Sequence, residues 1–331
     1  MKIVIDRDIP FIKGLFEQYA DVEYVAGADI NRDMVADADA LIVRTRTRCN
    51  ASLLEGSRVR IIATATIGTD HIDTNYCFKR GIIVANAAGC NARGVLQWIA
   101  AVLHHIVKRK ECNTNELRLG VVGVGNVGSL VVEYARNWGF DVVMCDPPRA
   151  RREEGDFREF DELLTSCDIL TFHTPLDDTT RHLLNSDNIS RLREGAIIIN
   201  ASRGGVVDNE AVLASGHDYY YDVWEGEPIV PSAVLQGAVL ATPHIAGYSR
   251  QGKANASAMV VRAVASMFGF RLGGWYPSEV TPAVSRPISW EDMCRSIGDY
   301  FDIEAESAHL KASSESFDAQ RNGYNYREEY F

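Results

Sequence analysis

The 331-residue sequence predicts an α/β fold with two parallel-sheet units, one inserted in the other. Short apolar segments rich in branched residues alternate with longer segments that are apolar at helical spacing, which is typical of β-α-β units. A glycine-rich turn restarts this alternation near residue 120, and a long helical pattern near residue 250 returns the chain to the first unit. The length and an apolar fraction of 46% favour more than one sizeable core.

The first unit is the smaller of the two, and we expect a flavodoxin-like α/β arrangement. Its predicted strands are Lys2–Ile5, Val22–Val25, Ala40–Arg44, Arg60–Thr66 and Ile82–Ala85. Helices are expected at Pro10–Tyr19 and at Asp70–Lys79, the latter capped by Thr69 or Asp70. This unit precedes the glycine-rich turn and is therefore not expected to be the nucleotide-binding domain.

The glycine-rich turn lies in the stretch Leu117 to Gly128, LRLGVVGVGNVG, where Gly123, Gly125 and Gly128 fit the pattern G-x-G-x-x-G. Glycines at these places allow a tight turn, close approach of a pyrophosphate, and close packing of helix on strand. The next predicted strand ends at Asp146, 18 residues after Gly128 (146 − 128 = 18). A carboxylate there accepts hydrogen bonds from ribose hydroxyls and repels a 2′-phosphate, which predicts NAD rather than NADP.

The second unit is expected to be a doubly wound parallel Rossmann sheet of six strands. Its strands are predicted from Leu117, and at Asp141–Cys145, Ile169–His173, Ala196–Asn200, Tyr219–Val223 and Val239–Thr242. Predicted helices are Asn91–Lys110, Asn126–Trp138, Phe160–Ser166, Ser186–Leu192, Asn209–Ala214, Ser249–Phe268 and Trp290–Tyr300. We expect domains at 1–92 with 256–280, at 93–255, and a short C-terminal segment at 281–331 that packs on the body or on a partner subunit.

Composition narrows the classes of function. A net charge of −11 disfavours nucleic acid or an anionic membrane as the main partner. The seven cysteines are dispersed without a C-x-x-C pair, and the N-terminus lacks a signal-peptide pattern, so we expect reduced thiols and a cytoplasmic location. No apolar run is long enough for a transmembrane helix, and no residue set has metal-ligand spacing.

Three reactive side chains follow predicted strands: Arg203, Glu227 and His244. Carboxyl ends of parallel strands meet at one rim of the sheet, where ligands bind. Arg203 can hold a carboxylate through two hydrogen bonds, and His244 can accept a hydroxyl proton as hydride leaves the same carbon. Glu227 would orient the imidazole and stabilise its protonated form. This set predicts oxidation of a 2-hydroxy acid.

Several motifs resemble the D-isomer-specific 2-hydroxyacid dehydrogenases from Met1 to about Gly274. They are ATATIGTDHID from Ala63, GCNA from Gly89, GVVGVGNVGS from Gly120, CDPPR from Cys145, LTFHTPL from Leu170, VVDN from Val206, DVWEGEP from Asp222 and TPHIAGY from Thr242. The wording of CDPPR and HIAGY narrows the resemblance to the branch that oxidises 4-phospho-D-erythronate in the synthesis of pyridoxal 5′-phosphate.

The resemblance implies roles by position. Arg203, Glu227 and His244 are the implied catalytic set. The implied NAD contacts are Gly123, Gly125, Asn126, Val127, Gly128, Asp146, Thr174, Ala201, Ser202, Arg203, Asp222 and Gly247. The implied substrate contacts are Thr45, Thr66 and Tyr248, and one of Arg44, Arg46 and Arg48, expected on one strand face, would meet a phosphate.

The function expected from these observations is NAD-dependent oxidation of a small phosphorylated 2-hydroxy acid by a homodimer. In longer relatives the C-terminal segment forms the dimer, and 281–331 resembles a reduced version. Two alternatives stay open. One is another substrate such as 3-phosphoglycerate, and the other is a non-catalytic NADH-sensing interaction protein of the same fold.

Overall fold

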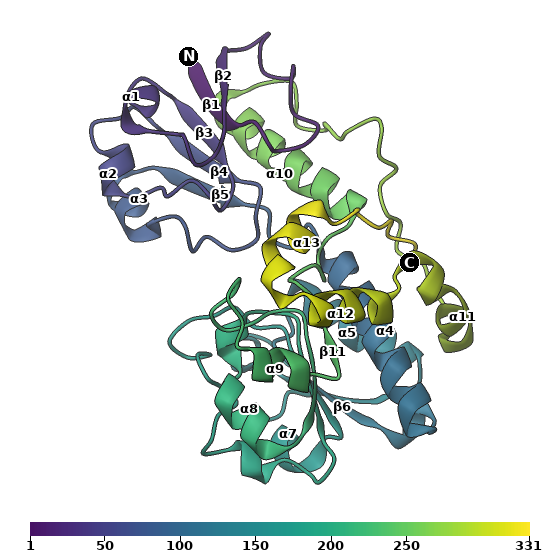
Figure 1. Cartoon of the computed structure of the whole chain (residues 1–331). Coiled ribbons are helices and arrows are strands. Elements are labelled where there is room, and N and C mark those ends of the chain that lie inside the picture. The colour runs from purple at the N-terminus through teal and green to yellow at the C-terminus, as the bar shows by residue number, and fades with distance from the viewer. The chain divides into compact units, whose positions relative to one another are not determined.

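The computed structural model describes all 331 residues and divides into two compact units. The first unit contains residues 1–91 and 250–282, and the second contains residues 92–249 and 283–331. Each unit has its own parallel sheet, which confirms the predicted α/β fold class. Figure 1 shows the course of the chain and labels many of the elements described below.

The sheet of the first unit has five parallel strands in the order β2-β1-β3-β4-β5. Three of them are buried along nearly their whole length, which is why their sequences are continuous apolar runs. The strands are β1 (Lys2–Asp6), β2 (Asp21–Val25), β3 (Ala40–Val43), β4 (Ile61–Thr64) and β5 (Ile83–Asn86).

Helices cover both faces of this sheet (Figure 1). Helix α10 (Arg250–Phe268) packs Val260, Val261 and Val264 against Ile3 and Ile5. The opposite face is covered by short helices that bury apolar side chains, namely α1 (Arg32–Val35), α2 (Ala51–Leu54) and α3 (Thr74–Arg80). The C-terminal half of the chain thus supplies one layer of the N-terminal unit.

Three predictions in the first unit were wrong. Residues 10–19 form turns rather than a helix, because Phe11 and Gly14 adopt left-handed backbone angles with φ of 70° and 87°. The helix predicted from residue 70 begins only at Thr74, where the Asp73 side chain accepts a 2.8 Å hydrogen bond from the Tyr76 N–H. Strand β3 ends before the arginine run, so the three arginines do not share a strand face.

The sheet of the second unit has six parallel strands in the order β11-β10-β9-β8-β6-β7. The strands are β6 (Arg118–Val122), β7 (Asp141–Cys145), β8 (Ile169–Phe172), β9 (Ile197–Asn200), β10 (Asp218–Tyr221) and β11 (Leu240–Ala241). From β6 the chain goes to one side for β7 and to the other for β8. The gap between β6 and β8 is the switch point where doubly wound sheets bind ligands.

Two helical layers enclose this sheet. One contains α4 (Ala92–Lys110) and α5 (Asn126–Asn137), which share a core with Leu119 and Val121 of β6. The other contains α7 (Phe160–Ser166), α8 (Asn209–Ser215) and α9 (Ser232–Gly237). Short turns of helix are η1 (Thr114–Glu116), α6 (Pro147–Ala150), η2 (Ile189–Arg191) and η3 (Gly204–Val206). Only η2 stands where a helix over 186–192 was predicted.

The C-terminal segment packs on the second unit. Helix α11 (Trp290–Tyr300) places Trp290 against Trp138 and Phe140. Two helices that were not predicted follow, α12 (Ile303–Ala312) and α13 (Phe317–Gly323), with the turn η4 (Ser314–Ser316) between them. The Ser307 hydroxyl of α12 accepts a 2.9 Å hydrogen bond from the Ala241 N–H of β11.

None of the helices combines the length and the apolarity needed to cross a bilayer. No group of three or more histidine, cysteine, aspartate or glutamate side chains is arranged to hold a metal ion.

Candidate active site

The glycine-rich turn joins β6 to α5 at the switch point. A Cβ on Gly128 would lie 2.0 Å from the Gly123 carbonyl oxygen, and one on Gly123 would lie 2.9 Å from that of His173. Both positions therefore need glycine for packing. A Cβ on Gly125 would meet nothing within 4 Å, so this glycine borders open space at the N-terminus of α5. Free N–H groups there suit a phosphate.

Two polar side chains beside this turn fit a dinucleotide. Asp146 follows β7 and accepts 2.8 and 2.9 Å hydrogen bonds from the N–H groups of Val124 and Arg149. A carboxylate has further lone pairs, so Asp146 keeps acceptor capacity for a ribose hydroxyl. The Thr174 hydroxyl, after β8, is buried without a hydrogen-bond partner in the protein. A buried orphan hydroxyl beside the turn is consistent with a bound ligand that supplies the partner.

Arg203 follows β9 on a loop that Asn200 holds in place. The Asn200 side-chain oxygen accepts hydrogen bonds from the Ser202 N–H (3.1 Å) and hydroxyl (2.8 Å), and its amide donates to the Arg203 carbonyl (3.0 Å). A Cβ on Gly204 would lie 2.0 Å from the Trp224 backbone, so the loop sits directly on the segment after β10. Arg203 itself is half-buried, and one guanidinium nitrogen donates to the Ser202 carbonyl.

Glu227 and His244 form a direct pair. The distance from His244 Nδ1 to Glu227 Oε1 is 2.5 Å, and Glu227 Oε2 accepts a 3.2 Å hydrogen bond from the Trp224 N–H. Burial alone would raise the pKa of Glu227, but the hydrogen bond and positive charge of His244, together with the charge of Arg321, lower it. Glu227 is therefore a carboxylate at neutral pH, and His244 turns its other ring nitrogen, Nε2, away from it.

The buried carboxylate of Asp222 organises the loop that carries His244. It accepts hydrogen bonds from the N–H groups of Ile245 (2.7 Å) and Ala246 (2.9 Å) and from the Thr242 hydroxyl (2.6 Å). Its carbonyl accepts a 2.7 Å hydrogen bond from the His244 N–H. His244 has a left-handed φ of 58°, an unfavourable conformation that these contacts hold in place. Burial raises the pKa of Asp222 despite these donors and the charge of His244.

The remaining predicted contacts are divided between the units. Ala201, Gly247 and Tyr248 belong to the second unit, on the loops after β9 and β11. Thr45 and Thr66 belong to the first unit. Thr45 is exposed on the turn after β3, and the Thr66 hydroxyl donates to the Gly68 carbonyl at 2.9 Å.

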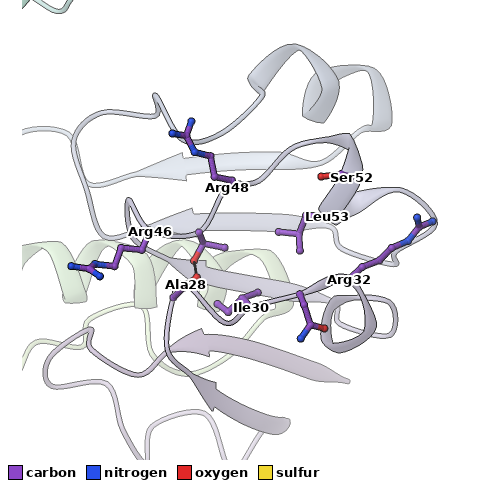
Figure 2. A pocket seen from close by; sticks show the side chains of 10 residues that line it. Ala28, Ile30, Arg32, Arg46, Arg48, Ser52 and Leu53 are labelled. Atoms are coloured by element: carbon purple, nitrogen blue, oxygen red, sulfur yellow. Dashed lines mark hydrogen bonds between the residues drawn. The ribbon is translucent and has the colours of Figure 1, made fainter. Parts of the chain in front are cut away.

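The three arginines after β3 differ in their surroundings. Arg44 is paired with the buried Asp6 (3.0 Å) and with Asp8 (2.9 Å), whereas Arg46 and Arg48 are exposed without an ion pair. The latter two border a cavity of about 310 Å³ in the first unit, together with Arg32, Ser52 and Leu53. Figure 2 shows the Arg46 and Arg48 side chains extending in different directions from its rim.

The sequence patterns missed two arginines of the C-terminal segment. Arg321 of α13 has Nη1 3.9 Å from Glu227 Oε1 and donates through Nε to the Tyr248 hydroxyl at 3.2 Å. Arg327 donates to the carbonyls of Gly94 (2.8 Å), Ile245 (3.1 Å) and Ala246. No local periodicity signals such contacts, because each joins residues more than 70 positions apart.

Comparison with known proteins identifies the family. A sequence model described as D-isomer specific 2-hydroxyacid dehydrogenase, NAD binding domain, matches residues 90–246. The erythronate-4-phosphate dehydrogenase of Bacteroides fragilis is 42% identical, an alignment that covers 99% of this chain and 97% of that protein. The chain belongs to the D-isomer specific 2-hydroxyacid dehydrogenase family.

Further relatives agree with this membership. The erythronate-4-phosphate dehydrogenase of Azotobacter vinelandii is 39% identical, over 99% of this chain and 93% of that protein. The structure of NAD⁺-bound 3-phosphoglycerate dehydrogenase from Entamoeba histolytica shares the fold, with a TM-score of 0.69 at 24% identity over 87% of this chain and 99% of that chain. The chain is thus an oxidoreductase of this dehydrogenase family and uses NAD, as the sequence predicted.

Proposed function

We propose that the chain oxidises 4-phospho-D-erythronate to (3R)-3-hydroxy-2-oxo-4-phosphooxybutanoate with NAD, in pyridoxal 5′-phosphate synthesis. The names of relatives that align along nearly the whole chain support this substrate. The observation that carries the chemistry is the 2.5 Å contact between His244 and Glu227 on the strand rim that also bears Arg203. That set provides an anion anchor and a proton acceptor for a 2-hydroxy acid.

Arg203 is the proposed anchor of the substrate carboxylate. Only one of its hydrogen-bond donors is used within the protein, on the Ser202 carbonyl. The remaining donors of a planar guanidinium suit a carboxylate, which Lys would bind less specifically. Its positive charge also stabilises negative charge that develops on the neighbouring oxygen as the ketone forms.

His244 is the proposed proton acceptor. Its Nδ1 faces Glu227, so Nε2 is the nitrogen that takes the substrate hydroxyl proton, and the imidazolium then formed is stabilised by the Glu227 carboxylate. Bound NAD supplies the hydride acceptor. The proton accepted by Nε2 and the hydride that NAD would accept together account for the two hydrogens and two electrons lost by the alcohol, so the product is the 2-oxo acid.

The exposed arginines after β3 are the proposed contacts of the substrate phosphate. Arg44 already neutralises Asp6 and Asp8, whereas Arg46 and Arg48 are uncompensated. Thr45 lies between Arg44 and Arg46 and offers a hydroxyl. We therefore assign the phosphate to Arg46 or Arg48 rather than to Arg44, with Thr45, Thr66 and Tyr248 as further substrate contacts.

Turnover measured by NADH absorbance tests the proposal. We expect reduction of NAD with 4-phospho-D-erythronate and much weaker reduction with 3-phosphoglycerate. Turnover with 3-phosphoglycerate alone would refute the substrate. Tight NADH binding without turnover on any 2-hydroxy acid would favour the NADH-sensing alternative.

The His244→Ala variant tests the assigned role. Loss of a general base lowers kcat by roughly 10²- to 10⁴-fold, while NADH affinity, measured by fluorescence titration, stays close to that of the unmodified protein. His309→Ala, which removes an exposed histidine on α12, is the matched control and keeps full activity. A parallel loss of NADH binding in His244→Ala would instead assign a structural role.

The homodimer and the cytoplasmic location also belong to the proposal. They rest on the family resemblance and on the dispersed thiols respectively, all seven of which are free. Analytical ultracentrifugation of the purified protein distinguishes a dimer from a monomer of 36.7 kDa.

A further inference from the structure

The C-terminal segment touches the candidate active site from within the same chain. Its helix α13 carries Arg321, whose side chain is 29% exposed and lies against residues of two loops of the second unit. Nη1 is 3.9 Å from Oε1 of Glu227, the same oxygen that accepts the hydrogen bond from His244. Nε donates to the Tyr248 hydroxyl at 3.2 Å.

The rest of the segment fixes this contact. Arg327 is 6% exposed and donates to the carbonyls of Ile245 and Ala246, directly after His244. Its guanidinium carbon lies 4.4 Å from the centre of the Phe301 ring, so the cation is also held from the segment's own side. The rings of Tyr324 and Tyr326 meet the Tyr248 ring edge-on, with centroids 6.2 and 5.9 Å away. The segment therefore packs along the loop that carries His244 and Tyr248.

We propose that Arg321 is a positioning residue of this enzyme: its guanidinium keeps Glu227 as a carboxylate directed at His244 and holds the Tyr248 hydroxyl in place. The C-terminal segment is thereby part of the active site in cis, in addition to any role in assembly. The inference rests on the proposed roles of His244 and Glu227, but its first test does not depend on turnover.

The charged groups around Glu227 and His244 determine whether loss of Arg321 makes protonation of this pair easier or harder. Asp222 lies behind the His244 loop, Tyr248 and Arg321 lie beside the pair, and Arg327 and Tyr324 lie further along the tail. The arginine nearest to Glu227 is Arg321, and its charge is among the causes that lower the pKa of that carboxyl. Without that cation the pair takes up a proton more readily, at a higher pH.

Carboxyl ¹³C NMR of the full-length protein provides the first test. The Glu227 signal is assigned by its absence in Glu227→Gln. We expect its titration midpoint to rise by about one pH unit in Arg321→Met, less than for a fully buried pair because the arginine is partly exposed. In Arg321→Lys, which retains the positive charge, the Glu227 midpoint should return most of the way to that of the unmodified protein.

Arg295→Met is the matched control, because Arg295 lies in the same segment, is 76% exposed, and pairs only with Asp292. It should leave the Glu227 midpoint unchanged. Thermal melting and NADH titration identify the folded variants, and Arg321→Gln replaces Arg321→Met if the latter does not fold. A Glu227 midpoint that stays at its original value in a folded Arg321 variant would overturn the proposal.

Turnover provides the second test. The acid limb of the kcat/KM profile should move to higher pH by the same amount, and kcat should fall about tenfold at neutral pH with NADH affinity unchanged. A shifted Glu227 midpoint without turnover on 4-phospho-D-erythronate would contradict the proposed substrate while the role of Arg321 holds. Equal loss of kcat and of NADH binding, without a shift, would make Arg321 purely structural.

Discussion

Alanine substitutions at two glycines of the β6–α5 turn should separate the turn's contribution to stability from its proposed contribution to NADH binding. In Gly128→Ala the new Cβ would lie 2.0 Å from the Gly123 carbonyl oxygen. Carbon–oxygen contacts need more than 3 Å, so the backbone of strand or helix must shift by roughly 1 Å. Overpacking of this kind costs about 3 kcal/mol or more when the obstructing atom is backbone. The melting temperature should then fall by about 6–12 °C.

In Gly125→Ala the new Cβ would meet nothing within 4 Å of protein. Gly125 is the N-cap of α5 with φ of −81° and ψ of −147°, a conformation at the edge of the extended region, so alanine should cost only about 1 kcal/mol of stability, less than Gly128→Ala. If the turn binds NAD as proposed, the methyl group instead occupies space that the pyrophosphate needs. We expect NADH affinity to fall at least tenfold, about 1.4 kcal/mol.

Differential scanning fluorimetry without cofactor and NADH fluorescence titration measure the two effects separately. The expected result is a crossed pattern, in which Gly128→Ala melts early and Gly125→Ala is stable but binds NADH poorly. A Gly125→Ala variant that binds NADH as tightly as the unmodified protein would refute the assignment of this turn to the pyrophosphate. A normal melting temperature for Gly128→Ala would refute the packing argument.

Two further substitutions address the carboxylates beside the turn and behind His244. Asp146→Ala should narrow the preference for NAD over NADP. It should also lower the free energy of unfolding by about 1 kcal/mol, because the N–H groups of Val124 and Arg149 lose their acceptor. An unchanged ratio of kcat/KM with NAD to kcat/KM with NADP would contradict a ribose role. Asp222→Ala leaves three donors without their carboxylate acceptor and should cost at least about 3 kcal/mol in urea unfolding. A loss below about 1 kcal/mol would show that Asp222 does not hold the His244 loop.

The order of strands and helices in the second unit followed from the sequence with few errors. Its strands are buried runs of branched residues, and its glycine-rich turn has a characteristic spacing, so local pattern and tertiary role agree. In the first unit the pattern misled at residues 10–19. Ile12 and Phe16 are buried there as a helix would bury them, but the left-handed angles at Phe11 and Gly14 preclude one.

The strand-end motifs placed Arg203, Glu227 and His244 on one sheet edge, because all strands of a parallel sheet end on the same side. They did not reveal what holds each side chain. That depends on Asn200 beneath the Arg203 loop and on Asp222 beneath the His244 loop, whose side chains accept backbone N–H groups nearby in space. Likewise, only the structure showed that Arg44 is neutralised while Arg46 and Arg48 are not.

The sequence by itself determined the fold class, the family and the use of NAD, because each follows from residue types at fixed spacing within single strands and loops. Tertiary structure alone decided what the last 49 residues, 283–331, do for the second unit. Arg321 and Arg327 reach the His244 loop across more than 70 residues of chain. A contact over that distance depends on how helices pack, which is a sum of many side-chain interactions that no local pattern contains.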